Sequence, residues 1–109
     1  MNTITKVEMT HHSCKRIRER MGIPTKGTER IAKIALQKGI THSEAIGDLK
    51  KYLSEIYLAY KVANNMKIYS NKIFIFCNVR LLTVLNLPQK FNVVVNKIKE
   101  RRNRALAMD

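Results

Sequence analysis

Apolar residues recur at three- and four-residue spacing in the first half of the chain, which is the spacing of one face of a helix. The first predicted helix runs from Thr10 to Met21. Cys14, Ile17 and Met21 face inward, and Gly22 ends the helix because glycine readily takes the left-handed conformation of a helix C-terminus.

Two further helices follow in the same half of the chain. The second is predicted to begin at a Thr28 cap and to run through Lys38, where Gly39 closes it. The third is predicted to open at Ser43, and its apolar positions continue at helical spacing across Gly47. These positions are Ile46, Leu49, Leu53, Ile56 and Tyr60.

The spacing of apolar residues changes in the second half of the chain. Segments 65–69, 73–77 and 81–87 are short apolar or alternating stretches separated by turn residues, which predicts three strands in an antiparallel meander. Segment 73–77 is apolar at every position, so we expect this strand to be central, with both of its faces covered. Pro88 ends the sheet, and a last helix follows. Its apolar positions are Phe91, Val94, Val95 and Ile98.

This order of elements predicts an α+β fold, with N-terminal helices, a small three-stranded antiparallel meander and a C-terminal helix. A chain of 109 residues has the length of one domain, and its 45% of hydrophobic residues suffices for a packed core. We expect residues 1–9 to form a frayed or weakly extended arm, and the last helix to end as a basic tail from about residue 97.

The N-terminal residues lack the apolar run of a signal peptide, and no uncharged apolar stretch reaches the ~18 residues of a membrane span. The chain has 2 cysteines, too few for a disulfide scaffold, and Cys14 and Cys77 are predicted to be reduced and buried. We therefore expect a cytoplasmic protein with no membrane partner.

The charge of the chain predicts the kind of partner that it binds. The chain has 21 Lys and Arg against 8 Asp and Glu, a formal net charge of +13. An excess of this size indicates a polyanionic partner, nucleic acid before any other. One basic cluster, Lys15 to Arg20, lies in the first helix, and a second, Lys97 to Arg104, lies near the C-terminus. Such clusters bind phosphate without reading sequence.

His12, Arg16 and Arg20 recur every four residues of the first predicted helix, so the spacing places them along one ridge. Metal-free RNA cleavage uses the 2′-hydroxyl as nucleophile and requires an acid or base and cations around the charged intermediate. His12 is the candidate acid or base, and Arg16 and Arg20 are the candidate cationic clamp. The alternative is a solvated basic helix face. His11 projects about 100° away on the helix, toward Lys15 and Arg18 at the edge of the apolar stripe, and is predicted to be an interfacial packing residue and not a second catalyst.

Further side chains are candidates for nucleic-acid contacts. Lys67 and Tyr69 share one face of segment 65–69, where a lysine contacts phosphate and a tyrosine stacks on a base; the alternative is an ordinary solvent-facing strand. His42 precedes the third helix, where it either has a structural role or approaches a ligand. The remaining predicted contacts are Lys15, Arg18, Lys99, Arg101 and Arg102.

No cofactor or metal ion is expected. The 3 histidines lack acidic companions at ligand spacing, so a metal site is not predicted. The sequence also lacks a glycine-rich phosphate loop, a nucleotide-binding fingerprint and a Ser-His-Asp arrangement.

Several short motifs carry a resemblance to a known group. They are His12-x-x-x-Arg16-x-x-x-Arg20-x-Gly22-Ile23 and the strand Leu81-Leu82-Thr83-Val84-Leu85. In addition, Ala63-Asn64-Asn65, Phe74-Ile75-Phe76 and Leu82-Thr83-Val84-Leu85 are similar to segments of short hypothetical proteins of Gram-positive bacteria and their phages. Over roughly residues 10–88 the chain resembles the RelE-like broad group of small bacterial and phage proteins, which is placed with barnase, EndoU and colicin-type ribonucleases. The resemblance implies N-terminal helices followed by an antiparallel sheet. It also implies metal-independent endoribonuclease activity, with the ribosome or a cognate antitoxin as partner.

Two functions remain open from the sequence. The first is a metal-independent endoribonuclease of toxin or phage-effector type. The second is a non-catalytic basic module that binds RNA or DNA, or serves a phage regulatory role, on the same scaffold. RNA is the favoured nucleic acid in both.

Overall fold

A computed structural model describes residues 6–107 of the chain. These residues form four helices, α1 (His11–Met21), α2 (Thr25–Lys38), α3 (Gly47–Ala59) and α4 (Asn92–Ala107). The strands are β1 (Ile40–Thr41), β2 (Asn65–Tyr69), β3 (Lys72–Cys77) and β4 (Arg80–Asn86). Short 3-10 turns, His42–Glu44 and Gln89–Phe91, precede α3 and α4. The predicted α+β class is confirmed.

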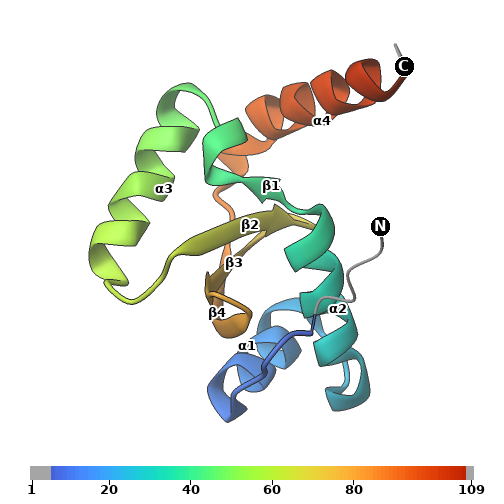
Figure 1. The fold of residues 1–109 in the computed structure, drawn as a ribbon, viewed down its shortest axis with the longest axis vertical. Coiled ribbons are helices and arrows are strands. Elements are labelled where there is room, and N and C mark those ends of the chain that lie inside the picture. The colour runs from blue at the N-terminus through green and yellow to red at the C-terminus, as the bar shows by residue number, and fades with distance from the viewer. Residues whose placement is uncertain (1–5, 108–109) are drawn as a thin grey trace.

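The sheet is the middle of three layers (Figure 1). Its strands run antiparallel in the order β1-β2-β3-β4, so strands that follow one another in the chain are also neighbours in the sheet. Helices α1 and α2 cover one face, and α3 and α4 cover the other. Each pair of helices closes its own apolar cluster against the sheet.

Strand β3 contributes to both apolar clusters because successive side chains of a strand point to opposite faces. Ile73 and Ile75 belong to the cluster under α3 and α4, whereas Phe74 and Phe76 belong to the cluster under α1 and α2. All four side chains are fully buried. The prediction that this strand is central and covered on both faces is confirmed.

The meander has one strand more than the sequence predicted. Strand β1 pairs with β2 through Ile40 with Ile68 and Thr41 with Lys67. Two residues are too short a stretch to show the alternation of a strand, which is why the pattern missed it. A Cβ atom on Gly39 would lie 2.6 Å from the Cβ of Lys67, so only glycine allows the end of α2 to approach β2 this closely.

The second helix begins one turn earlier than predicted. α2 starts at Thr25 directly after Pro24, whose extended backbone occupies the cap position. Thr28 is therefore inside the helix, buried, and its hydroxyl donates to the Thr25 carbonyl oxygen at 2.9 Å. The cap prediction was wrong because a threonine hydroxyl can also bond back to its own helix.

The third helix begins later than Ser43, so that prediction was also wrong. Thr41 and Glu44 form a capping box around the short 3-10 turn instead. The chain is then extended at Ile46, and α3 starts at Gly47, whose φ of 59° lies in the left-handed region that favours glycine. Leu49, Leu53 and Ile56 are buried, as the helical spacing predicted.

Both ends of α1 agree with the prediction. Thr10 caps the helix, and Gly22 ends it with a left-handed backbone. The preceding residues are less free than the predicted arm: Val7 is buried, and Glu8 forms a parallel bridge with Arg80 at the edge of β4. Residues 1–5 of the predicted arm lie outside the described residues.

The predicted basic tail is the second half of α4. Phe91, Val95 and Ile98 are buried against the sheet, and only the end of the helix, beyond Arg102, extends past the rest of the molecule (Figure 1). Among the helices of residues 6–107, none combines the length and the apolar character that crossing a membrane requires.

Replacing Phe74 by alanine should test the covered sheet face. We expect Phe74→Ala to lower the free energy of unfolding by about 3–5 kcal/mol, because it leaves a cavity between the sheet and α1–α2. Leu58→Ala is the control, since the Leu58 side chain is 77% exposed, and it should change stability by less than about 0.5 kcal/mol. Urea unfolding of both variants measures the difference, and equal losses would contradict the packing of this face.

Candidate nucleic-acid interface

The predicted ridge of His12, Arg16 and Arg20 turns around α1 instead of facing one direction. Each step of four residues advances about 40° around a helix, so eight residues turn by about 80° and rise about 12 Å. His12 is accordingly exposed, whereas Arg16 and Arg20 are progressively nearer the sheet and half-buried.

These three predicted catalytic residues also have separate surroundings. The Nη1 atom of Arg16 donates to the Oε1 atom of Glu19 at 2.7 Å. Arg20 lines a groove with Asn71 and Lys72, at the turn between β2 and β3. The structure therefore does not bring the imidazole and the two guanidinium groups together around one phosphate.

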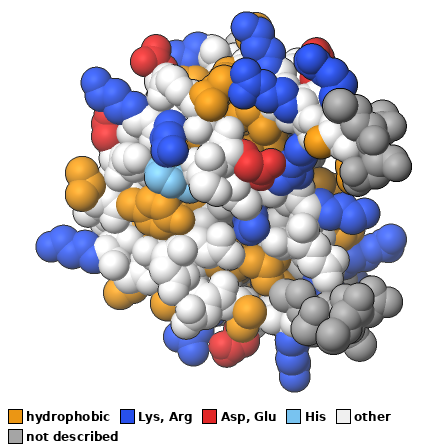
Figure 2. Space-filling view, turned by 45° about the horizontal axis from the view of Figure 1, so that its top comes forward, with side chains coloured by type: hydrophobic (Ala, Val, Ile, Leu, Met, Phe, Trp, Pro, Cys, Tyr) orange, Lys and Arg blue, Asp and Glu red, His pale blue; other side chains and the backbone are white. Residues whose placement is uncertain are grey.

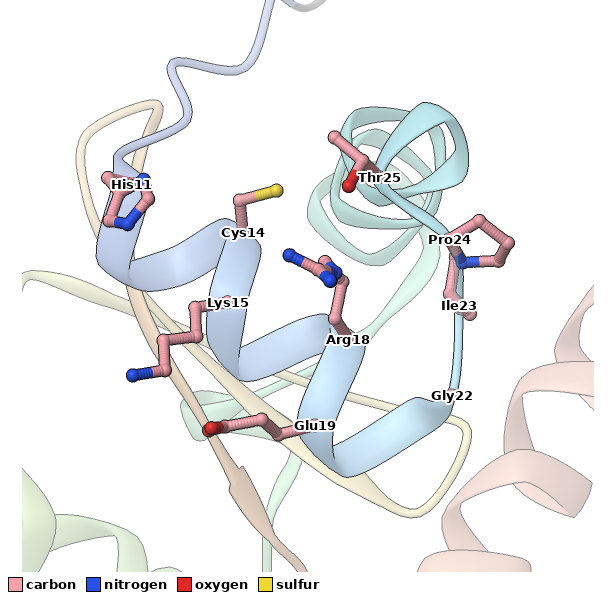
Figure 3. Close-up of a pocket in the computed structure, with 9 residues that line it drawn as sticks. All are labelled: His11, Cys14, Lys15, Arg18, Glu19, Gly22, Ile23, Pro24 and Thr25. Carbon is pink, nitrogen blue, oxygen red and sulfur yellow. The ribbon is translucent and has the colours of Figure 1, made fainter.

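Another face of α1 borders a groove between the first two helices. This α1–α2 groove has a volume of about 720 Å³ and lies between α1 and the start of α2. The predicted contacts Lys15 and Arg18 both line it, together with His11. Figure 3 shows the guanidinium group of Arg18 pointing between the two helices, whereas Lys15 and Glu19 extend away from α2.

His11 is exposed and lines this groove, so the expectation of a packing residue was wrong. The reason is geometric: His11, Lys15 and Arg18 follow one another at four- and three-residue spacing, which places them on one helix face. The sequence analysis placed His11 toward Lys15 and Arg18 correctly, but it could not show that this helix face borders a groove.

Helix α2 adds cations that the sequence analysis passed over. Lys26, Arg30 and Lys33 recur at four- and three-residue spacing on the side of α2 opposite its buried residues Thr28, Ala32 and Ala35. Residues 11–38 hold eight Lys and Arg against two Glu, whereas α3 holds two Lys against one Asp and one Glu. We call Lys15, Arg18, Lys26, Arg30 and Lys33 the basic α1–α2 layer.

Arg102, a predicted nucleic-acid contact, is held inside the fold. Its Nε atom donates to Glu44 Oε2 at 2.6 Å and its Nη2 atom to Glu44 Oε1. Its Nη1 and Nη2 atoms also donate to the carbonyl oxygens of Lys38 and Gly39, at 2.7 and 2.9 Å. These bonds fasten the far half of α4 to the end of α2 and leave few donors for a ligand.

Arg102 affects the pKa values of Glu44 and Lys67. Hydrogen bonds from Arg102 are the main reason that the pKa of Glu44 falls from 4.5 to about 2, and the Thr41 backbone N–H adds to the effect. Burial lowers the pKa of Lys67, and the positive charge of Arg102 lowers it further. The partial burial that lowers this pKa also makes the Lys67 ammonium less accessible to a phosphate than an exposed lysine.

Lys67 and Tyr69 do share one face of β2, as predicted, but that face is not exposed. It is the face that α2 covers: Gly39 at the end of α2 lies against Lys67, and Tyr69 packs on the apolar cluster under α1 and α2. Both side chains are half-buried. Because α2 covers this face, the alternative of an ordinary solvent-facing strand is wrong as well.

His42 contacts its neighbours in α3. Its Nε2 atom lies 3.0 Å from the Ser54 hydroxyl oxygen, and its ring packs edge-on against Tyr57. The Ser54 hydroxyl also donates to the Lys50 carbonyl oxygen at 2.9 Å. This arrangement supports a structural role for His42, because the serine proton is already engaged and the imidazole is not placed to remove it.

The other predicted contacts lie on α4. Lys99 lines a groove of about 430 Å³ with Lys38 and Tyr69, between the end of α2 and α4. Arg101 is exposed and directly precedes Arg102, the residue that fastens α4 to the end of α2. Figure 2 shows Lys and Arg side chains outnumbering Asp and Glu side chains on the face that it presents.

Residues 6–107 contain no group of three or more His, Cys, Asp or Glu side chains placed to hold a metal ion. Cys14 and Cys77 are free thiols and are half-buried, less enclosed than predicted. The Cys14 sulfur lies 3.4 Å from the Thr28 hydroxyl, at the border between α1 and α2.

Stability should depend on pH through Glu44. Its folded-state pKa of about 2 lies below its ordinary 4.5, so its contribution is complete above about pH 5 and is lost as the pH falls toward 2. Glu44→Gln should lower the free energy of unfolding at neutral pH by about 1–2 kcal/mol, a value reduced for partial exposure. Urea unfolding from neutral pH to about pH 3 should show this difference shrinking. Glu100→Gln is the control because its ion pair with Arg104 is exposed; a similar pH-dependent loss there would contradict the assignment.

Comparison with protein-family models, with curated proteins and with solved structures found no match to this chain. The similarity to RelE-like proteins therefore stays an expectation from short motifs, and the function has to be argued from the geometry of the chain itself.

Proposed function

We propose that this protein binds single-stranded nucleic acid, RNA in preference to DNA, through its basic α1–α2 layer. The observation that carries the proposal is the α1–α2 groove, into which Arg18 points from a helix layer with eight cationic and two acidic side chains. Sequence-independent binding depends on such clustered phosphate contacts.

The electrostatics of the groove favour an anion. Glu19 is the one carboxylate that lines it, and Glu19 is paired with Arg16 at 2.7 Å. Arg18 and Lys15 thus face no unpaired acidic group among the lining residues. Arg18 supplies a planar fork of donors that matches two phosphate oxygens, and Lys15 supplies a mobile point charge at the rim.

Helix α3 differs in charge from the basic α1–α2 layer. Helix α3 on the opposite side of the sheet has as many acidic as basic residues, so it provides a neutral surface that a polyanion has no reason to prefer. The excess positive charge would also steer a nucleic acid toward the protein at low salt. Because α3 is neutral and the α1–α2 layer is basic, the proposal can be tested with variants that remove the same charge from each of them.

Binding has more support than cleavage. His12 is exposed and is not among the residues that line the α1–α2 groove, and Arg16 is neutralised by Glu19. A metal-independent endoribonuclease, free or acting with the ribosome or a cognate antitoxin, remains the alternative that a cleavage assay separates from binding.

The double variant Lys15→Gln/Arg18→Gln should weaken binding to a short labelled RNA by about tenfold, because it removes two phosphate contacts. Lys50→Gln/Lys51→Gln removes the same charge from α3 and should change affinity by less than about twofold. Fluorescence anisotropy at several salt concentrations measures both, with DNA of the same sequence in parallel. The salt slope of the first variant should be less steep by about 0.7 per lost contact. Equal losses of affinity in the two variants would show that total charge, and not the α1–α2 layer, determines binding, and would contradict the proposal.

RNA incubated with the protein and EDTA near neutral pH should remain intact, and His12→Ala should keep the affinity of the unchanged protein, because His12 lies outside the groove. Gel electrophoresis of labelled RNA provides the measurement. Cleavage that disappears in His12→Ala would overturn the binding reading and favour the ribonuclease.

A further inference from the structure

A second polar groove lies at the end of the β2–β3 hairpin, outside the α1–α2 groove. It has a volume of about 470 Å³. Its lining comes from four separate segments: the last turn of α1, the hairpin turn, the end of β4 and the segment that leads into α4. The polar side chains that line it are Arg20, Asn71, Lys72, Asn86, Gln89 and Asn92.

The composition of this lining is that of an anion site. It has two cations, Arg20 and Lys72, and four amide side chains that can donate hydrogen bonds, but no carboxylate. In the α1–α2 groove, by contrast, Glu19 is part of the lining. An unneutralised pair of cations in one groove is costly to the folded chain and is relieved when an anion binds.

Arg20 has hydrogen-bond donors that no other described residue accepts. It is half-buried, and its Nε–H is buried without a hydrogen-bond partner among residues 6–107. Arg16, one turn earlier, is instead paired with Glu19. The enclosed Nε–H is out of reach of a ligand, but the Nη groups of Arg20 are not enclosed and have no acceptor among residues 6–107, so they keep their donors for an acceptor from outside.

The frame around the two cations is rigid. Lys72 pairs with Tyr69 of β2 and with Asn86 of β4 in the sheet register. Asn71, at a φ of 61°, forms the tight hairpin turn, and its carbonyl oxygen accepts from the Leu87 N–H at 3.1 Å. Groups fixed in this way lose little freedom when a ligand binds.

From these observations we infer that the hairpin-end groove is a phosphate site, occupied by a phosphodiester of the bound nucleic-acid backbone. Arg20 donates to two phosphate oxygens, Lys72 adds a second positive charge, and the amide side chains donate to the remaining oxygens. This inference rests on the proposed function. It extends the path of the nucleic acid from the α1–α2 groove around the C-terminal end of α1.

The site can be observed directly by nuclear magnetic resonance of the ¹⁵N-labelled full chain. Dimethyl phosphate, inorganic phosphate and a short single-stranded RNA are titrated separately at constant ionic strength. We expect dimethyl phosphate and RNA to shift the Nε–H signal of Arg20 and the side-chain amide signals of Asn71, Asn86 and Asn92. Inorganic phosphate shares the tetrahedral chemistry, so shifts with it alone would mean a free-phosphate site and would overturn the assignment to a backbone phosphodiester.

Variants give the matching affinity measurement. Arg20→Gln should weaken RNA binding by about tenfold. Arg80→Gln, at the opposite exposed end of β4, removes the same charge and should weaken it by less than about twofold. Because Arg20 is half-buried, circular dichroism checks that the Arg20→Gln variant folds. If that variant unfolds, Lys72→Gln provides the test in its place and should also weaken RNA binding.

The two proposals fail in different ways. RNA that binds with no shift at Arg20 overturns the hairpin-end site and leaves the α1–α2 layer as the interface. Absence of RNA binding by the unchanged protein overturns the proposed function. In that case, shifts with dimethyl phosphate would still support an anion site at Arg20, and their absence would overturn it as well.

Discussion

The burial of β3 on both faces is the constraint on which the rest of the fold depends. Its alternate side chains belong to two different apolar clusters, so neither face of the sheet can be left to water. Two helices must therefore lie on each side, and the chain has four to supply. The charged residues of the helices then lie mostly outside the two apolar clusters, which is how a sequence of net charge +13 acquires basic outer surfaces on α1, α2 and α4.

The two outer layers are not equivalent, although both pack against the same sheet. Helices α1 and α2 direct their cations away from small buried residues such as Ala32 and Ala35, whereas α3 balances its charges. Helix α4 is basic but is fixed through Arg102, whose donors are engaged by Glu44 and by two carbonyl oxygens. Net charge alone therefore overstates the number of cations that are free to meet a ligand.

The candidate grooves share a structural origin. Each forms between elements and not on the side of a single helix: the α1–α2 groove lies along α1 beside the start of α2, and the hairpin-end groove lies around the β2–β3 turn. Concave surfaces of this kind surround a ligand with groups from several directions, which a convex helix face cannot do. For this reason, an exposed residue such as His12 contributes less than its chemistry would suggest.

Much of the fold was readable from the chain. Spacing identified the first helix with its Thr10 and Gly22 ends, and the unbroken apolar run at 73–77 identified the central strand. These features are local, since periodicity and capping involve residues within a few positions of one another. β1 was missed because a two-residue segment takes its structure from a distant partner, β2, and the start of α3 was missed because a second capping box, at Thr41 and Glu44, competes with Ser43 as a helix start.

The sequence by itself determined the helices, the central strand and the excess of positive charge, because composition and periodicity are properties of the chain. Only the tertiary structure decided which cations are available. It paired Arg102 with a carboxylate 58 positions away, covered Lys67 with α2, and placed Arg20 beside Lys72 in a groove without carboxylates. Hydrogen bonds and charge interactions depend on distances in space, and packing sets those distances independently of separation along the chain.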